Sequence, residues 1–213
     1  MIKTEDTRHR ILMTAMAMFS EDGIDAVTLR SINTAAGCSN TGAVHYHFCN
    51  KDGLIQAIID FLQKKIWQPA FAELNVLLSQ DPSLREILET ALWPDRRILF
   101  EERWGVDATS FCFEISTGSH ENYRSALKKI YAPHFDLLYE TLNKRLKDLP
   151  EAALKQRVKF LFSEVMVGHW ARTRVQRTLL IEWSKVSQEI YFNDYIDFAI
   201  GGLLAPCSNP VKN

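Results

Sequence analysis

The chain has 213 residues, of which 46% are apolar, and its 25 basic and 26 acidic residues leave a net charge of −1. This apolar content supports a folded core and excludes a disordered chain. The near-neutral charge excludes a general binder of polyanions. The polar N-terminus, the lack of a long apolar run and the absence of a CxxC pair predict a cytoplasmic protein without a signal peptide or membrane contact.

The first predicted helices are short and amphipathic. Over residues 7–22 apolar side chains recur at i, i+4, i+7 and i+8, which places them on one helical face. Gly23 should end this helix because glycine tolerates a left-handed backbone. A second helix over residues 28–36 should begin at Thr28, a good N-cap residue.

A tight turn and a very short polar helix follow. Gly37 should take the left-handed conformation, and Ser39 or Asn40 should cap a helix from about Thr41 to His47. A short polar helix behind such a turn suits insertion into the major groove of DNA. This pattern predicts a helix-turn-helix, in which Phe48, just after the short helix, is a core residue.

The rest of the chain is predicted to be helical as well. Asn50 should cap a fourth helix that runs to about Trp67 and stops before Pro69. Further helices are expected over residues 107–117, over 122–148 with Pro133 inside it, over 150–174 and over 182–204. No alternating pattern typical of strands occurs. The sequence therefore predicts an all-α fold.

Several spaced residues of this region together resemble the tetracycline-repressor (TetR) family. They are Thr28-Leu29-Arg30-Ser31-Ile32, Ala36-Gly37, Gly42-Ala43-Val44-His45-Tyr46-His47-Phe48 and Lys51-Asp52-Gly53-Leu54. The resemblance implies an all-helical, homodimeric, ligand-responsive transcription regulator that binds a double-stranded DNA operator. It also implies a three-helix DNA-binding domain over residues 1–52, joined by a fourth helix to a helical effector-binding and dimerisation domain over 53–213.

Candidate DNA contacts lie at the start of the second helix and around the short one. The resemblance assigns phosphate contacts to Thr28, Tyr46 and Lys51. It lets Arg30 reach a base, where arginine can grip guanine with two hydrogen bonds. The full predicted set is Thr28, Arg30, Ser39, Asn40, Thr41, Gly42, His45, Tyr46, His47 and Lys51.

A metal site is an alternative interpretation of the same stretch. Cys38, His45, His47 and Cys49 lie close together in sequence, and zinc favours such ligands. However, residues two apart on a helix point in different directions, and this spacing matches no zinc motif. We expect neither a metal nor a cofactor.

The last two long helices are the predicted dimer interface. The final helix is apolar on nearly every side, so it must be covered on two sides, by its own domain and by a partner subunit. The family resemblance implies a four-helix bundle at the same place. The predicted interface residues are Val158, Phe162, Val165, Ile190, Tyr195, Ile196 and Phe198.

Aromatic residues in the middle of the chain permit two interpretations. A tryptophan and phenylalanine cluster at helical spacing is usually core, but here it could also line a pocket for a small, largely apolar effector. The candidate pocket residues are Trp104, Phe111, Phe113, Glu114, His134, His169 and Trp170.

Two other function classes compete with a DNA-binding regulator. The sequence has no G-x-S-x-G, P-loop, dinucleotide-binding or H-E-x-x-H motif, so an enzyme is not expected. A helix-turn-helix used as a protein-interaction scaffold is the remaining alternative, which the polar short helix disfavours.

Overall fold

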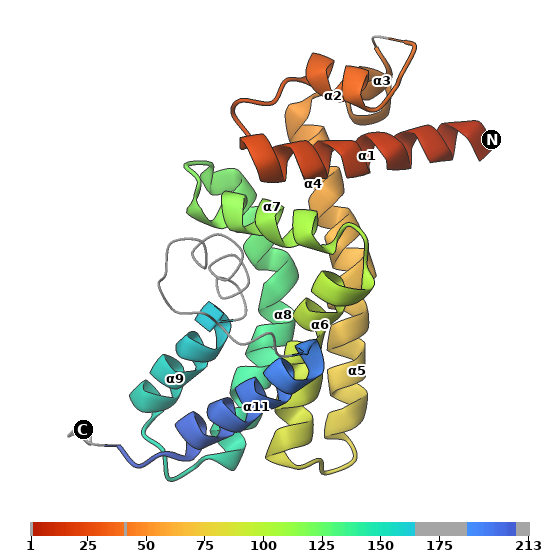
Figure 1. Cartoon of the computed structure of the whole chain (residues 1–213). Helices are drawn as coiled ribbons and strands as arrows, with labels where there is room; N and C mark the ends of the chain where they lie inside the picture. The colour runs from red at the N-terminus through yellow and green to blue at the C-terminus, as the bar shows by residue number, and fades with distance from the viewer. Residues whose placement is uncertain (1, 41, 165–186, 208–213) are drawn as a thin grey trace. The chain divides into compact units, whose positions relative to one another are not determined.

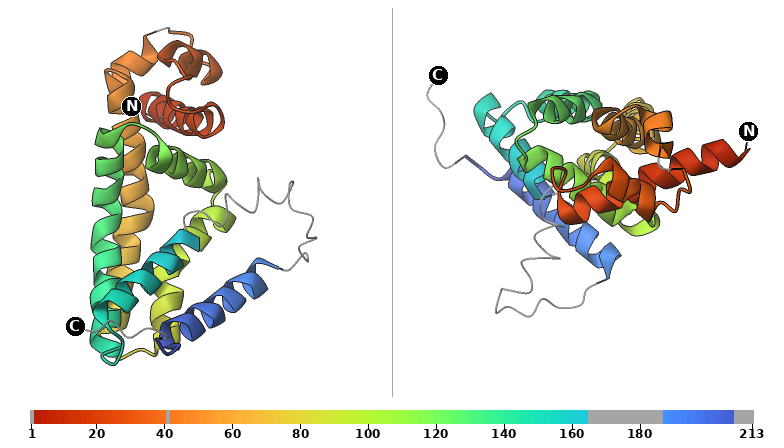
Figure 2. Two further views of the ribbon diagram at one scale, coloured as in Figure 1. Left: turned by 90° about the vertical axis from the view of Figure 1, so that its left-hand side faces the viewer. Right: turned by 90° about the horizontal axis from the view of Figure 1, so that it is seen from above.

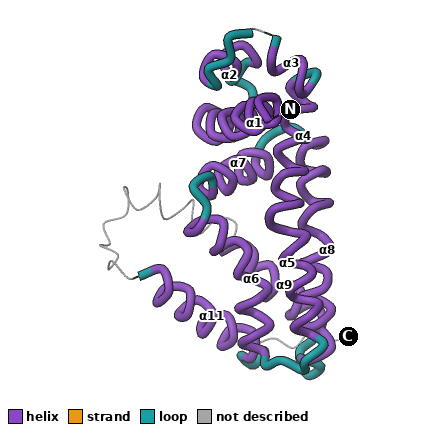
Figure 3. Tube along the Cα trace, turned by 90° about the vertical axis from the view of Figure 1, so that its right-hand side faces the viewer, coloured by secondary structure: helices purple, strands orange, loops and turns teal. Residues whose placement is uncertain are grey.

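The computed structural model describes residues 2–40, 42–164 and 187–207. The regular elements in these ranges are helices, drawn in purple in Figure 3. None of the helices in this part of the chain is long and apolar enough to cross a membrane. The predicted all-α fold is confirmed over these residues.

Capping residues mark some of the boundaries of the N-terminal elements. They are α1 (Ile2–Asp22), α2 (Leu29–Ala35), α3 (Ala43–Phe48), α4 (Lys51–Leu62) and the π-helix η1 (Gln63–Trp67) (Figure 1). Gly23, with a φ of 83°, follows α1. The side chains of Thr28 and Asn50 cap α2 and α4, as predicted. Figure 2 shows α1 to α4 gathered together, and contacts join α1 to each of the other three.

The remaining described helices lie between Gln68 and Leu204. They are α5 (Gln68–Leu78), α6 (Leu84–Glu101), α7 (Gly105–Thr117), α8 (Glu121–Arg145), α9 (Glu151–Ser163) and α11 (Gln188–Leu204). Pro133 lies inside α8, as predicted. The helix predicted over 150–174 is present to Ser163, and residues 165–186 lie outside the described part of the chain.

The prediction that the fourth helix stops before Pro69 was wrong. The chain stays helical from Lys51 through η1 into α5, and Pro69 is the second residue of α5. In η1 the Gln68 amide bonds to the Gln63 carbonyl, five residues back. This wider turn, together with a position in the first turn of α5, lets the helix accept a residue that has no backbone N–H.

One compact unit consists of residues 1–69 and 97–131. Within it α7 packs along α1, and the rings of Phe19 and Phe111 lie 6.2 Å apart. Both side chains are fully buried. This unit therefore contains the predicted helix-turn-helix together with α7 and the first part of α8.

The other unit consists of residues 70–96 and 132–213. Leucine and isoleucine side chains from α5, α6, α8, α9 and α11 form its core. His134 is fully buried there, and its Nε2 lies 2.8 Å from the carbonyl oxygen of Ala91. Burial lowers the pKa of His134, so the neutral imidazole is favoured.

Candidate nucleic-acid interface

The start of α2 is fixed by a reciprocal pair of hydrogen bonds. The Ser31 amide donates to the Thr28 hydroxyl, and the Thr28 amide donates to the Ser31 hydroxyl, both at 3.1 Å. This capping box satisfies backbone donors at the end of the helix. Thr28 and Arg30 are both exposed. The structure thus places these two predicted contact residues at the solvent-facing start of α2.

The turn between α2 and α3 is held by a buried asparagine. The side-chain amide of Asn33 donates to the carbonyl oxygen of Asn40 at 2.8 Å. Gly37 has a φ of 63°, so the predicted left-handed conformation is confirmed. Sequence reasoning missed Asn33. Its position directly after the core residue Ile32 was the available signal, since a polar residue that shares a buried helix face needs a partner.

The start of α3 differs from the prediction that Ser39 or Asn40 caps it. The helix begins at Ala43, and its N-cap residue, Gly42, has no side chain to cap it. The side-chain oxygen of Asn40 instead accepts the Gly42 amide at 2.9 Å, which is an Asx turn. Because α3 starts later than expected, Ser39 and Asn40 are exposed turn residues. Thr41 lies outside the described residues.

Helix α3 has one buried and one exposed face. The buried residues are Ala43, Val44 and Phe48. His45 and Tyr46 face solvent, and Tyr46 is 77% exposed. The half-buried ring of His47 stands edge-on to the ring of Tyr46 at 5.0 Å. The assignment of Phe48 to the core is confirmed, and the exposed face carries hydrogen-bonding side chains.

The connection from α3 to α4 is a γ-turn centred on Cys49. Cys49 has φ 64° and ψ −54°, and the Asn50 amide donates to the Phe48 carbonyl oxygen at 2.7 Å. The Gly53 amide donates to the Asn50 side chain at 2.8 Å. A Cβ atom on Gly53 would lie only 2.1 Å from the Phe48 carbonyl oxygen. Backbone contacts therefore fix the direction of α3 relative to α4.

The basic side chains of this module have different roles. Nε of Arg10 donates to the Ala36 carbonyl oxygen at 2.8 Å and so ties α1 to the end of α2. Among the described residues, no acidic side chain pairs with Arg30 or Lys51. No carboxylate of the described residues therefore neutralises either charge, although Nζ of Lys51 lies 5.8 Å from the centroid of the Phe19 ring. The described part of the chain contains no group of three side chains that could hold a metal ion.

The helices around this turn match a known family of DNA-binding domains. The family described as "Bacterial regulatory proteins, tetR family" matches residues 11–58. This N-terminal module belongs to the tetR family. The match includes α2, the turn, α3 and most of α4, so it confirms the resemblance that the sequence indicated.

Similarity to individual proteins of this kind extends further along the chain. The HTH-type transcriptional regulator AcrR of Shigella flexneri is 32% identical over 106 residues, which are 47% of this chain and 48% of AcrR. The chain thus spans about half the length of this relative. The solved structure of HlyIIR, a hemolysin II transcriptional regulator, has a TM-score of 0.67 at 16% identity and covers 95% of this chain and 99% of its own. A SmeT–triclosan complex has a TM-score of 0.63 at 19% identity, covering 98% and 100%. These two structures show that the fold is shared.

The predicted effector residues are split between the two compact units. Trp104, Phe111, Phe113 and Glu114 lie in the unit that holds the DNA-binding module, whereas His134 belongs to the other unit. Trp104 is edge-on to Phe61 at 5.1 Å, and Phe111 is core. Phe113 and Glu114 are half-buried. His169 and Trp170 lie outside the described residues.

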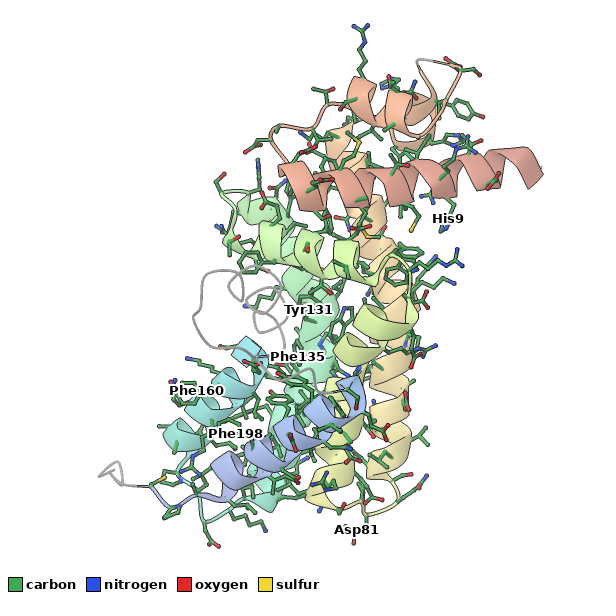
Figure 4. All side chains as sticks on the ribbon, in the orientation of Figure 1. His9, Asp81, Tyr131, Phe135, Phe160 and Phe198 are labelled. Atoms are coloured by element: carbon green, nitrogen blue, oxygen red, sulfur yellow. The ribbon has the colours of Figure 1, made fainter. Side chains whose placement is uncertain are left out.

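A cavity of about 710 Å³ lies between α9 and α11. Apolar and aromatic side chains dominate its wall, with a few charged groups. The lining residues are Arg157, Phe160, Leu161, Ser163, Glu164, Tyr191, Asp194, Tyr195, Phe198, Ala199, Gly202 and Leu203. Phe160 and Phe198, labelled in Figure 4, are 63% and 76% exposed.

The predicted dimer residues fall into two groups. Val158 and Ile196 are buried in the core of their own unit, and Phe162 is packed against it. The Tyr195 hydroxyl donates to the Leu161 carbonyl oxygen at 2.7 Å. Ile190 and Phe198 are exposed. Val165 lies outside the described residues.

Proposed function

We propose that this protein is a ligand-responsive transcriptional repressor that binds a palindromic operator as a homodimer in the cytoplasm, where bacterial DNA lies. The observation that carries the proposal is the exposed polar face of α3, with His45 and Tyr46, inside a module that matches the tetR family. Arg30 and Lys51 supply positive charge beside it. AcrR, the relative that matches 47% of the chain, is a transcriptional regulator.

In this proposal residues 1–52 read DNA and residues 53–213 bind the effector and the second subunit. Tyr46 and Lys51 contact phosphates, which positions the protein without reading sequence. Arg30 contacts a base. The other proposed contacts are Thr28, Ser39, Asn40, Thr41, Gly42, His45 and His47.

The proposal is tested by selection from a random duplex library. The purified full-length chain is incubated with the library, and the retained duplexes are sequenced and then bound in titrations at several salt concentrations. We expect a palindrome with half-sites about 34–36 Å apart, or a multiple of that distance, because two subunits related by a two-fold axis read successive major grooves. Recovery of duplexes without a shared sequence would overturn the proposal.

The second subunit is proposed to cover the exposed face of α9 and α11. Phe160 of α9 and Phe198 of α11 line the cavity there, and Ile190 is a further exposed apolar residue of α11. Burial of such side chains favours association by about 25 cal/mol per Å² of apolar area removed from water. Sedimentation at micromolar concentration checks this point, and a monomer would contradict it.

The effector is proposed to be small and largely apolar, and Trp104, Phe111, Phe113, Glu114, His134, His169 and Trp170 remain its proposed contacts. A structure of SmeT, which shares the fold, contains triclosan. Tryptophan fluorescence titrations with candidate compounds, with and without the selected duplex, test the idea. Operator must weaken effector binding by the factor by which effector weakens operator binding. A compound that binds equally well in both cases is not the inducer.

A protein-interaction scaffold and a small helical enzyme are the competing functions. Neither explains why the exposed residues of α3 carry hydrogen-bonding groups while Arg30 and Lys51 lack acidic partners in the described residues. A preference for one duplex sequence in the library selection separates the regulator from both alternatives.

A further inference from the structure

The N-terminal end of α8 contacts the DNA-binding module at two points. Tyr123, in the first turn of α8, is buried, and its hydroxyl donates to the Asp52 carboxylate in the first turn of α4. His120 lies just before α8, and its Nε2 is 2.9 Å from Oδ1 of Asp25, three residues before Thr28. All of these residues belong to one compact unit. One end of α8 therefore touches both the approach to α2 and the start of α4.

The Tyr123 contact is the stronger of the two. Only 8% of Tyr123 is exposed, and a buried hydroxyl without a partner loses its hydrogen bonds to water. Burial, and next the hydrogen bond to Asp52, raise the pKa of Tyr123 to about 12, so the phenol stays a donor at physiological pH. The Asp25 side chain, in contrast, is 80% exposed, and exposed ion pairs contribute little.

Asp52 lies where a small displacement of its side chain and backbone would also move α3, the short helix proposed to read DNA. It follows Lys51 and lies between Asn50, which caps α4, and Gly53, which contacts the Phe48 carbonyl. The γ-turn at Cys49 closes this connection to α3. Because these contacts involve backbone, α3 and the first turn of α4 should move together. A side chain that fixes the position of Asp52 through a hydrogen bond therefore also fixes the orientation of α3.

We propose that Tyr123 is a positioning residue for DNA recognition, which fixes the orientation of α3 by holding the first turn of α4 through Asp52. The inference rests on the proposed function. It gives α8 a route to the DNA-reading surface that needs no contact between α8 and DNA. A movement of this end of α8 would release Asp52 and lower operator affinity at every base position alike.

The test compares Tyr123→Phe with Tyr139→Phe in the full-length chain. Tyr139 is also on α8 and its hydroxyl also faces a carboxylate, that of Glu151 at 3.5 Å, but it lies in the other unit. Two quantities are measured: amide hydrogen exchange over residues 43–54, and affinity for the duplex that the wild-type chain selects from a random library. We expect Tyr123→Phe to speed exchange and to weaken binding, each about tenfold, as for loss of a hydrogen bond to a charged group. Tyr139→Phe should change neither.

An Asp52→Ala variant and the double variant complete the design. If the two side chains act as a pair, the double variant exchanges no faster than Tyr123→Phe alone. Faster exchange spread evenly over residues 1–69 would indicate a general loss of stability and overturn the inference. Unchanged operator affinity in Tyr123→Phe would overturn it as well, while leaving the proposed function intact. If the wild-type chain selects no duplex, the proposed function fails and the inference fails with it.

Discussion

Tyr46 on α3 and Phe198 on α11 are almost equally exposed, at 77% and 76%, but their surroundings differ. Tyr46 stands among histidines on a helix whose exposed side chains are polar. Phe198 faces the same cavity as Phe160. The comparison teaches that exposure alone does not identify a partner. The neighbours do, since hydrogen-bonding groups suit phosphates and bases, whereas contiguous apolar side chains suit another protein surface.

The two regions also differ in how tightly their backbone is constrained. In α4 a Cβ on Gly53 would collide with the Phe48 carbonyl, whereas a Cβ on Gly201 in α11 would meet nothing within 4 Å. In the module proposed to bind DNA, the backbone between α3 and α4 is thus too closely packed to accept a side chain at Gly53. The exposed face of α11 has room for added side-chain atoms.

Gly53→Ala and Gly201→Ala give the largest expected contrast. We expect Gly53→Ala to lower the free energy of unfolding by about 3 kcal/mol, because the carbonyl that must shift belongs to the backbone. Gly201→Ala should raise it by about 0.5–1 kcal/mol, since alanine suits a helix interior better than glycine. Urea unfolding followed by circular dichroism measures both. Equal effects of the two substitutions would remove the contrast.

Phe198→Asp tests the apolar side of the comparison. An aspartate in a buried subunit contact should weaken the dimer by about 2 kcal/mol or more, the effect typical of a central interface residue. The measurement is sedimentation equilibrium over a range of concentrations. Val76→Asp is the matched control, because Val76 is 62% exposed on α5 and does not line the cavity between α9 and α11. A dimer weakened equally by both substitutions would argue against this interface.

Much of the DNA-binding module could be predicted from sequence because its signals are local. A capping residue such as Thr28 or Asn50 and a left-handed glycine such as Gly37 act within a few residues of their own position. The errors were local too. Helix α3 starts two residues later than expected, so Asn40 forms an Asx turn and does not cap the helix. The π-helix η1 keeps the chain helical, so the fourth helix does not stop before Pro69.

Contacts between distant segments could not be read in this way. Nothing near Asp52 in the sequence indicates that Tyr123, 71 residues away, donates to it. Similarly, an apolar pattern on all sides of α11 does not say which side its own unit covers. The structure buries Ile196 and exposes Phe198, a distinction that depends on how the other helices of that unit pack.

Tyr46→Phe tests the polar side of the comparison. Loss of the hydroxyl should weaken operator binding by about 1.5 kcal/mol, which is typical for the loss of a hydrogen bond to a charged group. The loss should be similar for every DNA sequence, since phosphates carry no base information. Arg30→Ala should instead flatten the preference at one base position. Titrations of single-base operator variants distinguish the two patterns. Because the Tyr46 side chain is 77% exposed, the substitution should leave the free energy of unfolding unchanged.

Cys49→Gly should have the smallest effect, and it should be favourable. Cys49 and Asp81 are the non-glycine residues with positive φ in the described part of the chain, at 64° and 51°. A strained backbone conformation costs about 1–3 kcal/mol, and glycine removes that cost but gains entropy when unfolded. We therefore expect a net gain of about 1 kcal/mol in urea unfolding for Cys49→Gly. Asp81→Gly should bring no gain, because aspartate tolerates the left-handed region and the change removes the 3.0 Å ion pair with Arg145. If Cys49→Gly lowers stability, the γ-turn between α3 and α4 is not under strain.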